Sequence, residues 1–182
     1  MHYLCHYGIK GMKWGVRRYM DENGNPIIPK GTKLYRVTND SEKLDSTRKY
    51  VTNNKTSSKK YERLYTGGDK VKLTLKTNKD LKLAGRKEVE KYLTDTFKVK
   101  NIYDNVSVDK FQSKYGYELY DFAGRNSSNR VENNEHIKKL IDMGYDAIVD
   151  MKDYRGNIFD MPIILLKPDS DTVLIGKKYL NK

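Results

Sequence analysis

Residues 144–168, GYDAIVDMKDYRGNIFDMPIILLKP, hold two short apolar runs, DAIVDM and FDMPIILL, joined by the polar turn KDYRGN. A third run, DTVLIG, follows at residues 171–176 after the turn KPDSD. Short apolar runs bounded by turn residues are typical of buried strands. We therefore expect strands of one compact sheet at the C-terminal end of the chain.

Further strands and helices are predicted upstream. Apolar and polar residues alternate in KVKLTLKT, residues 70–77, and in GTKLYRVTN, residues 31–39, which predicts two strands. Helices are expected over residues 86–97, around residues 58–64 and over residues 129–143, with Gly144 as the stop of the last. Residues 106–116 are a further helix candidate. This order predicts an α+β fold with compact split mixed or antiparallel sheets flanked by helices.

The N-terminal part differs from the rest of the chain. DENGNP, residues 21–26, is a cluster of turn-forming residues and is typical of a linker or a tight reversal. We therefore expect residues 1–29 to be an extended peptide with its linker, and residues 30–182 to form one domain.

Composition narrows the class of partner. The 182 residues carry a formal net charge of +12, which favours polyanions such as nucleic acid. The single cysteine, Cys5, permits no intramolecular disulfide. No apolar stretch approaches the roughly 20 residues that a membrane span needs, and the N-terminus lacks the apolar region of a secretory signal. We expect a soluble protein that works in a cytoplasm and has no membrane partner.

Common ligand motifs are not found in the sequence. His2, Cys5 and His6 are too few for a tetrahedral zinc site, and His136 is expected on the polar side of its helix, so we predict no metal. The sequence contains neither a GxxxxGK[ST] phosphate loop nor a GxGxxG dinucleotide motif after a strand.

The order of several segments resembles the ADP-ribosyltransferase fold: LYRV, then YVT with KKY, then KLTLKT, then GYDAIVD with MPIILLKP. The resemblance implies NAD as cofactor, with the Arg36 guanidinium on its phosphates, a role that suits a forked donor. It also implies that Thr52 stands at the Ser/Thr position of the nicotinamide pocket and that Tyr61 or Tyr50 stacks on the ring. A charged residue within a strand also fits an outward-facing position, and this interpretation of Arg36 stays open.

The catalytic position departs from the family pattern. The family has a glutamate on the strand that corresponds to residues 162–166, and this chain offers Asp160 instead. Aspartate is one methylene shorter, and an error of about 1 Å in placing a reacting group can lower a rate about 100-fold. The resemblance covers roughly residues 30–178 and leaves open whether the domain is an NAD-dependent enzyme.

HYGIKGMKWGVRRY, residues 6–19, closely resembles the HxGxKGMKWGxRR signature at an end of many phage-encoded structural and head-associated proteins. This implies a place inside a phage virion, or in the host cytoplasm after ejection. Glycines allow close backbone approach, while Met and Trp are apolar anchors among cations. We expect the segment to dock on an acidic-rimmed groove of a portal, scaffold or capsid protein through Lys10, Gly11, Met12, Lys13, Trp14, Gly15, Arg17 and Arg18. The alternative is that Trp14 packs on the body as a latch.

Three functions are consistent with these patterns. The first is a phage virion-associated minor head protein, ejected or retained, whose ADP-ribosyltransferase-like domain binds NAD. The second is a catalytically inactive structural or DNA-contacting head component with the same fold. The third is an inhibitor of host defence that binds an NAD-like nucleotide without turning it over.

Overall fold

A computed structural model of the chain describes residues 19–20, 26–40, 49–64, 69–99, 109–111, 113–114, 122, 130–150 and 162–180. The strands are β1 (Tyr19–Met20), β2 (Pro26–Ile28), β3 (Lys33–Asn39), β4 (Lys49–Thr52), β5 (Lys70–Thr77), β6 (Leu81–Ala84), β7 (Ala147–Val149), β8 (Pro162–Leu165) and β9 (Thr172–Tyr179). The helices are α1 (Lys55–Leu64), α2 (Arg86–Phe97), α4 (Arg130–Asp142) and α6 (Pro168–Asp171). The chain therefore has a mixed α and β architecture, which confirms the predicted α+β class.

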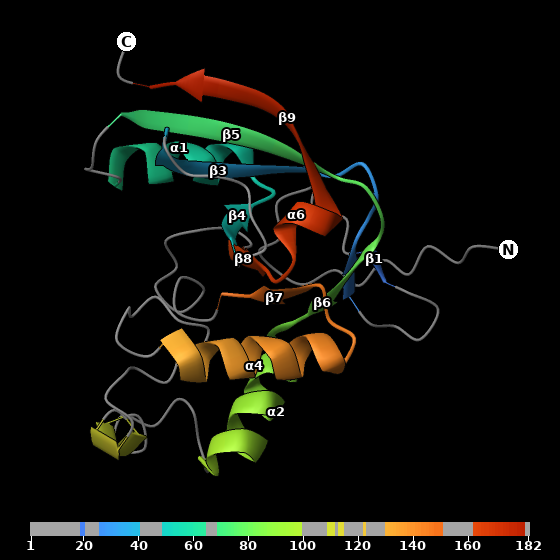
Figure 1. Cartoon of the computed structure of the whole chain (residues 1–182), viewed down its shortest axis with the longest axis vertical. Coiled ribbons are helices and arrows are strands. Elements are labelled where there is room, and N and C mark those ends of the chain that lie inside the picture. Colours follow the sequence, from blue (N-terminus) through green and yellow to red (C-terminus); the bar gives the residue numbers. More distant parts are fainter. Residues whose placement is uncertain are drawn as a thin grey trace, which may run out of the picture.

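The strands form one nine-stranded sheet in the order β1-β2-β6-β7-β8-β4-β3-β5-β9. β6 and β7 are parallel, and the other pairs formed by described residues are antiparallel. The sheet curls, so that β3, β5 and β9 lie above β7 and β6 (Figure 1). We expected split sheets, but β4 pairs with both β3 and β8 and joins the two groups of strands.

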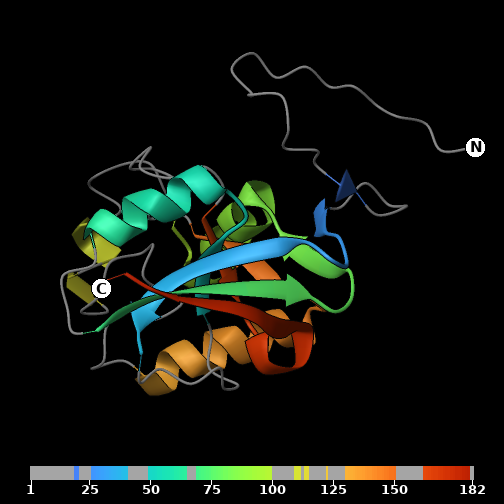
Figure 2. The same ribbon diagram turned by 90° about the horizontal axis from the view of Figure 1, so that it is seen from above.

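The helices cover different parts of this sheet. Seen from above, α1 lies along one side of β3 and β5, while α4 and α6 lie toward the other side (Figure 2). The main core is packed between the strands β6, β7 and β8 and the helices α2 and α4. Its most buried large side chains include Leu81, Leu93, Leu140, Ile148, Ile163 and Leu165.

Several elements have the bounds that the sequence patterns predict. β5 spans residues 70–77 and α2 spans residues 86–97, as expected. α4 ends where Gly144 adopts φ +88°, and the amides of Gly144 and Tyr145 donate to the carbonyls of Ile141 and Leu140. This is the Schellman arrangement, in which glycine avoids the steric cost of the left-handed conformation.

Short elements that the sequence patterns did not predict include β1, β2, β6 and α6. β2 lies within the predicted linker, yet it pairs with β6, and its Ile28 side chain is buried in the core. The sheet therefore begins before the expected boundary at residue 30.

Candidate functional site

Arg36 lies in the middle of β3, on the same face of the strand as Leu34 and Thr38, because side chains alternate along a strand. Both neighbours are buried, and so is Leu73, which is opposite Arg36 on β5. Arg36 itself is half-buried, and its Nη1 donates to the Tyr50 carbonyl of β4 at 3.0 Å. The open interpretation that Arg36 faces outward is therefore wrong. We call the face of the sheet that carries Arg36 the inner face.

The strand order brings together the three strands to which the resemblance assigns site residues. β4, with Thr52 at its end, lies between β3, with Arg36, and β8, which begins two residues after Asp160. Pro162 of β8 is directly opposite Thr52. Asp160 itself lies outside the described residues, so only the strand that follows it is placed.

Thr52 is fully buried, and its hydroxyl has a local role. The Asn54 amide donates to Thr52 Oγ1 at 3.1 Å, and Asn54 Oδ1 in turn accepts from the Thr56 amide at 2.8 Å. These bonds satisfy amides at the start of α1, as N-capping residues do. Tyr35 is the residue opposite Thr52, so the pleat directs Arg36 and Thr52 to opposite faces of the sheet.

Tyr61 belongs to α1, which packs on the outer face, the face of Tyr35 and Lys72. There the Lys72 ammonium lies 2.9 Å from Glu62 of α1 and 5.2 Å from the centre of the Tyr35 ring. Tyr61 is half-buried on this helix. The structure therefore brings Thr52 and Tyr61 to one side of the sheet and Arg36 to the other.

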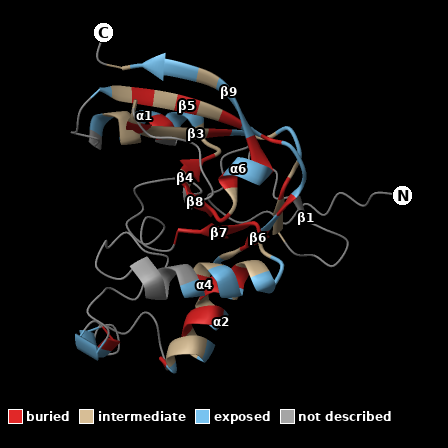
Figure 3. Cartoon of the chain, in the orientation of Figure 1, coloured by how far each residue is buried: buried red, intermediate tan, exposed pale blue. Residues whose placement is uncertain are grey.

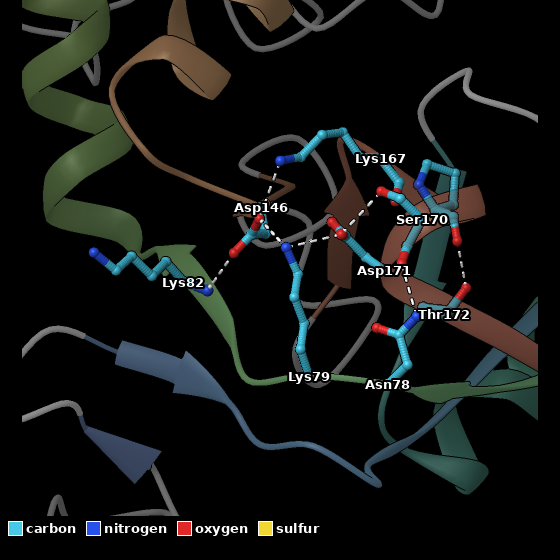
Figure 4. Close-up of polar contacts among 9 residues, drawn as sticks. Asn78, Lys79, Lys82, Asp146, Lys167, Ser170, Asp171 and Thr172 are labelled. Carbon is cyan, nitrogen blue, oxygen red and sulfur yellow. Dashed lines mark hydrogen bonds and ion pairs between the residues drawn. The ribbon is translucent and has the colours of Figure 1, made fainter.

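The most connected polar cluster of the described residues was missed by sequence reasoning (Figure 4). The Lys79 ammonium lies 2.9 Å from Asp146 Oδ1 and 2.9 Å from Asp171 Oδ1. Lys167 is 3.3 Å from the same Asp146 oxygen, and the Lys82 amide donates to Asp146 Oδ2 at 3.0 Å. The turn between β5 and β6, the start of β7 and the helix α6 meet in this cluster.

The pKa values of Asp146 and Lys79 are shifted in opposite directions. Burial by itself raises the pKa of Asp146, but the hydrogen bonds from Lys79 and the Lys82 amide outweigh it and hold the pKa below its ordinary value. Burial by itself lowers the pKa of Lys79, and the bonds to Asp146 and Asp171 reverse that effect and raise it. Both groups are therefore charged at neutral pH.

The ion pairs of this cluster fit a structural role, in which they hold the β5–β6 turn, the start of β7 and α6 together. Two lysines face two aspartates, so the charges balance, and Lys79 occupies the space between the carboxylates. Among the described residues, no group of three or more His, Cys, Asp or Glu side chains could hold a metal ion. No sequence motif predicts this cluster, because its residues come from elements that are far apart in the sequence.

A cavity of about 430 Å³ lies between α2 and the end of α4. Its lining includes Glu88, Tyr92 and Asp95 from α2, with Met143 and Tyr145 after α4. The Tyr92 hydroxyl is 2.7 Å from His136 Nδ1, and that contact is buried. His136 was expected on the polar side of its helix and is instead only 5% exposed, because it packs against aromatic rings of the core.

The predicted docking segment, Lys10 to Arg18, lies outside the described residues. The sequence model of a family of unknown function, DUF7211, matches residues 1–21, which include this segment. None of the curated proteins and none of the solved structures compared with the chain matches it. None of the helices in the described part combines the length and the apolar character that crossing a membrane requires.

Proposed function

We propose that this chain is a phage virion-associated minor head protein whose body binds NAD as an ADP-ribosyltransferase-like domain. In this proposal it resides in the virion interior and acts there or, once ejected, in the host cytoplasm. The resemblance of residues 6–19 to a signature of phage head-associated proteins supports the location. The family match over residues 1–21 is consistent with a leader that recurs as a unit.

The observation that carries NAD binding is the position of Arg36. It is half-buried on the inner face, its guanidinium is oriented by the Tyr50 carbonyl, and it lies two strands from β8. Arginine presents five N–H donors in a planar fork, and the bond to the Tyr50 carbonyl fixes the position of one of them. A pyrophosphate is the NAD group that such a fork recognises best.

The roles of the other expected residues change with this geometry. Thr52 supports the start of α1 from within the sheet, and Tyr61 lies on the outer side, so neither shares a face with Arg36. The proposal therefore rests on Arg36 for the phosphates and on Asp160, before β8, for the carboxylate that stabilises the reacting ribose.

NAD binding is tested by calorimetry and by thermal unfolding with millimolar NAD. We expect NAD to raise the unfolding temperature of the parent and Arg36→Gln to weaken binding at least about tenfold, a loss typical of one charged hydrogen-bonded contact. Arg63→Gln is the matched control, because Arg63 is exposed on α1 and carries no ion pair with another described residue. Equal NAD binding by the parent and Arg36→Gln would refute the proposed site.

Catalysis is tested separately with labelled NAD and a host lysate. The proposal predicts transfer of label to a host component by the parent and its loss in Asp160→Ala. Identical behaviour of parent and variant removes Asp160 from the mechanism, while NAD binding without transfer or hydrolysis reduces the domain to a nucleotide-binding module.

The location is tested through Trp14. Trp14→Ala should abolish incorporation into phage particles and leave the thermal midpoint of the purified protein unchanged, because the side chain anchors a partner contact. A large fall in the midpoint with normal incorporation would instead establish Trp14 as a latch on the body.

A second candidate is a catalytically inactive head component that contacts DNA. The separation of Arg36 from Thr52 and Tyr61 favours it, since an NAD pocket built from all of them would need them on one face. The net charge of +12 favours it as well. DNA binding that falls steeply with salt, together with no stabilisation by NAD, would select this function.

A further inference from the structure

Exposed apolar side chains are concentrated on β9. Among the described residues, four of the five large apolar side chains that are exposed belong to this strand: Val173 at 48%, Leu174 at 50%, Ile175 at 47% and Tyr179 at 44%. Most of β9 is coloured as exposed, in contrast to the buried strands β4, β7 and β8 (Figure 3). Side chains alternate along a strand, so Val173 beside Lys76 and Leu174 beside Leu75 expose apolar surface on both faces of the sheet.

β9 is also an edge of the sheet. β5 is the only described strand that pairs with it, and the strand order ends at β9. The pairing contains an irregularity between Thr74 and Leu75, where Ile175 has no partner on β5. An edge strand presents a row of backbone donors and acceptors to any extended segment that approaches it.

Most charged side chains next to this edge are lysines, of which Lys177 on β9 forms an ion pair with Asp40 at the end of β3. Lys33 is directly opposite Lys76 across β3 and β5, and Lys72 is directly opposite Lys178 across β5 and β9. Like charges in directly opposed positions destabilise a sheet, so their presence here needs a compensating role. Glu62 neutralises Lys72, whereas Lys33, Lys76 and Lys178 are exposed and form no ion pair with another described residue.

We propose that β9 accepts an extended segment of a partner protein as a tenth strand, and that this segment carries apolar residues flanked by acidic ones. The apolar residues would cover Val173, Leu174 and Ile175, and the acidic residues would neutralise Lys76 and Lys178. Backbone pairing provides affinity in this mode, and alternate side chains provide specificity. A second copy of this chain fits less well, because its β9 edge would bring the same lysines to the interface and add to the positive charge there.

This inference is independent of NAD binding and concerns the opposite edge of the sheet from β1. It is tested with the full chain and a fluorescent synthetic peptide, Thr-Glu-Glu-Thr-Val-Ile-Val-Thr-Glu. In antiparallel register its first two glutamates meet Lys177 and Lys178, and its last glutamate lies at the Val173 end of β9, beside Lys76. We expect saturable binding by anisotropy and slower amide hydrogen exchange across residues 173–178. The same peptide with lysines in place of the glutamates should bind at least tenfold more weakly.

Charge-reversal variants locate the site. K76E/K178E should weaken binding of the acidic peptide on the order of tenfold, the combined effect of two exposed charge pairs. K87E/K138E is the matched control, since Lys87 and Lys138 are exposed, form no ion pair with another described residue and lie on α2 and α4. The control should bind as the parent does.

Four results would overturn the proposal. An equal loss of peptide affinity in both double variants would show that binding depends only on the net charge of the protein. Equal binding by a peptide with N-methylated alternate amides would exclude strand pairing. Dimerisation of the chain that Val173→Lys abolishes would identify a second copy as the occupant. Displacement of the peptide by duplex DNA, with the same dependence on Lys76 and Lys178, would identify a nucleic acid.

Discussion

Lys79 forms an ion pair at 2.9 Å with Asp171, whose side chain is only 2% exposed, while the lysine is 46% exposed. The Asp171 carboxylate is thus shielded from water. Its negative charge is stabilised by the Lys79 ammonium and by the Ser170 hydroxyl, which donates to Oδ1 at 3.0 Å. The second oxygen, Oδ2, is buried and has no hydrogen-bond partner among the residues that the structure describes. A buried carboxylate with so few partners depends on each of them.

Lys79→Met should therefore destabilise the fold, although Lys79 lies in a surface turn. The variant keeps the aliphatic stem and removes the ammonium group that pairs with both Asp146 and Asp171. We expect a loss of about 1–3 kcal/mol in the free energy of unfolding, measured by urea titration, because hydrogen bonds to charged groups contribute about that much. Lys82→Met is the control, since Lys82 contributes only its backbone amide to the cluster. Equal effects of both substitutions would contradict this account.

The same cluster predicts a dependence of stability on acid. The pKa of Asp146 is lowered in the folded state, so its contribution is fully present above the unfolded value and is lost as pH falls through the folded value. Below about pH 4, the stability of the parent should fall toward that of Asp146→Asn. Urea titrations of both proteins at several pH values measure the difference, and a difference that stays constant down to pH 2 would contradict the assignment.

Gly144 should resist substitution for a backbone reason alone. Its φ is +88°, and a Cβ added there would meet no atom within 4 Å. Gly144→Ala should cost about 1–2 kcal/mol through the left-handed conformation. Gly176→Ala is the matched control, because its added Cβ would meet Thr74 only at ordinary contact distance, 3.6 Å. Thermal unfolding should show a lower midpoint for Gly144→Ala only.

The parts of the fold that sequence patterns predicted are those where one face is buried over many residues. Val71, Leu73 and Leu75 alternate along β5, and Val89 and Leu93 lie one turn apart on α2, so periodicity defined both elements. β2 and β6 have three and four residues, which is too short for a period to appear. Their existence depends on pairing with each other and with β7, which is tertiary information.

The candidate site was less predictable than the fold. The structure places Arg36, Thr52 and the start of the strand after Asp160 on neighbouring strands, but the face of each side chain depends on register, which the order of segments in the sequence does not give. A shift by one residue moves a side chain to the other face, and the pairing of Tyr35 with Thr52 separates Thr52 from Arg36. The lysines beside β9 appeared scattered in the sequence because they are opposed only across strands.

Ile28 tests whether the body begins before residue 30. Its side chain is 4% exposed and packs in the core, whereas the adjacent Ile27 is half-exposed. Ile28→Ala should lower the free energy of unfolding by about 2–4 kcal/mol, the usual cost of truncating a buried aliphatic side chain. Ile27→Ala should cost less than half as much, since less of its surface leaves water on folding. Deletion of residues 1–29 should destabilise the protein at least as much as Ile28→Ala, because it also leaves β6 without its antiparallel partner. Urea titrations of the three variants make the comparison, and a deletion protein as stable as the parent would place the start of the domain at residue 30 after all.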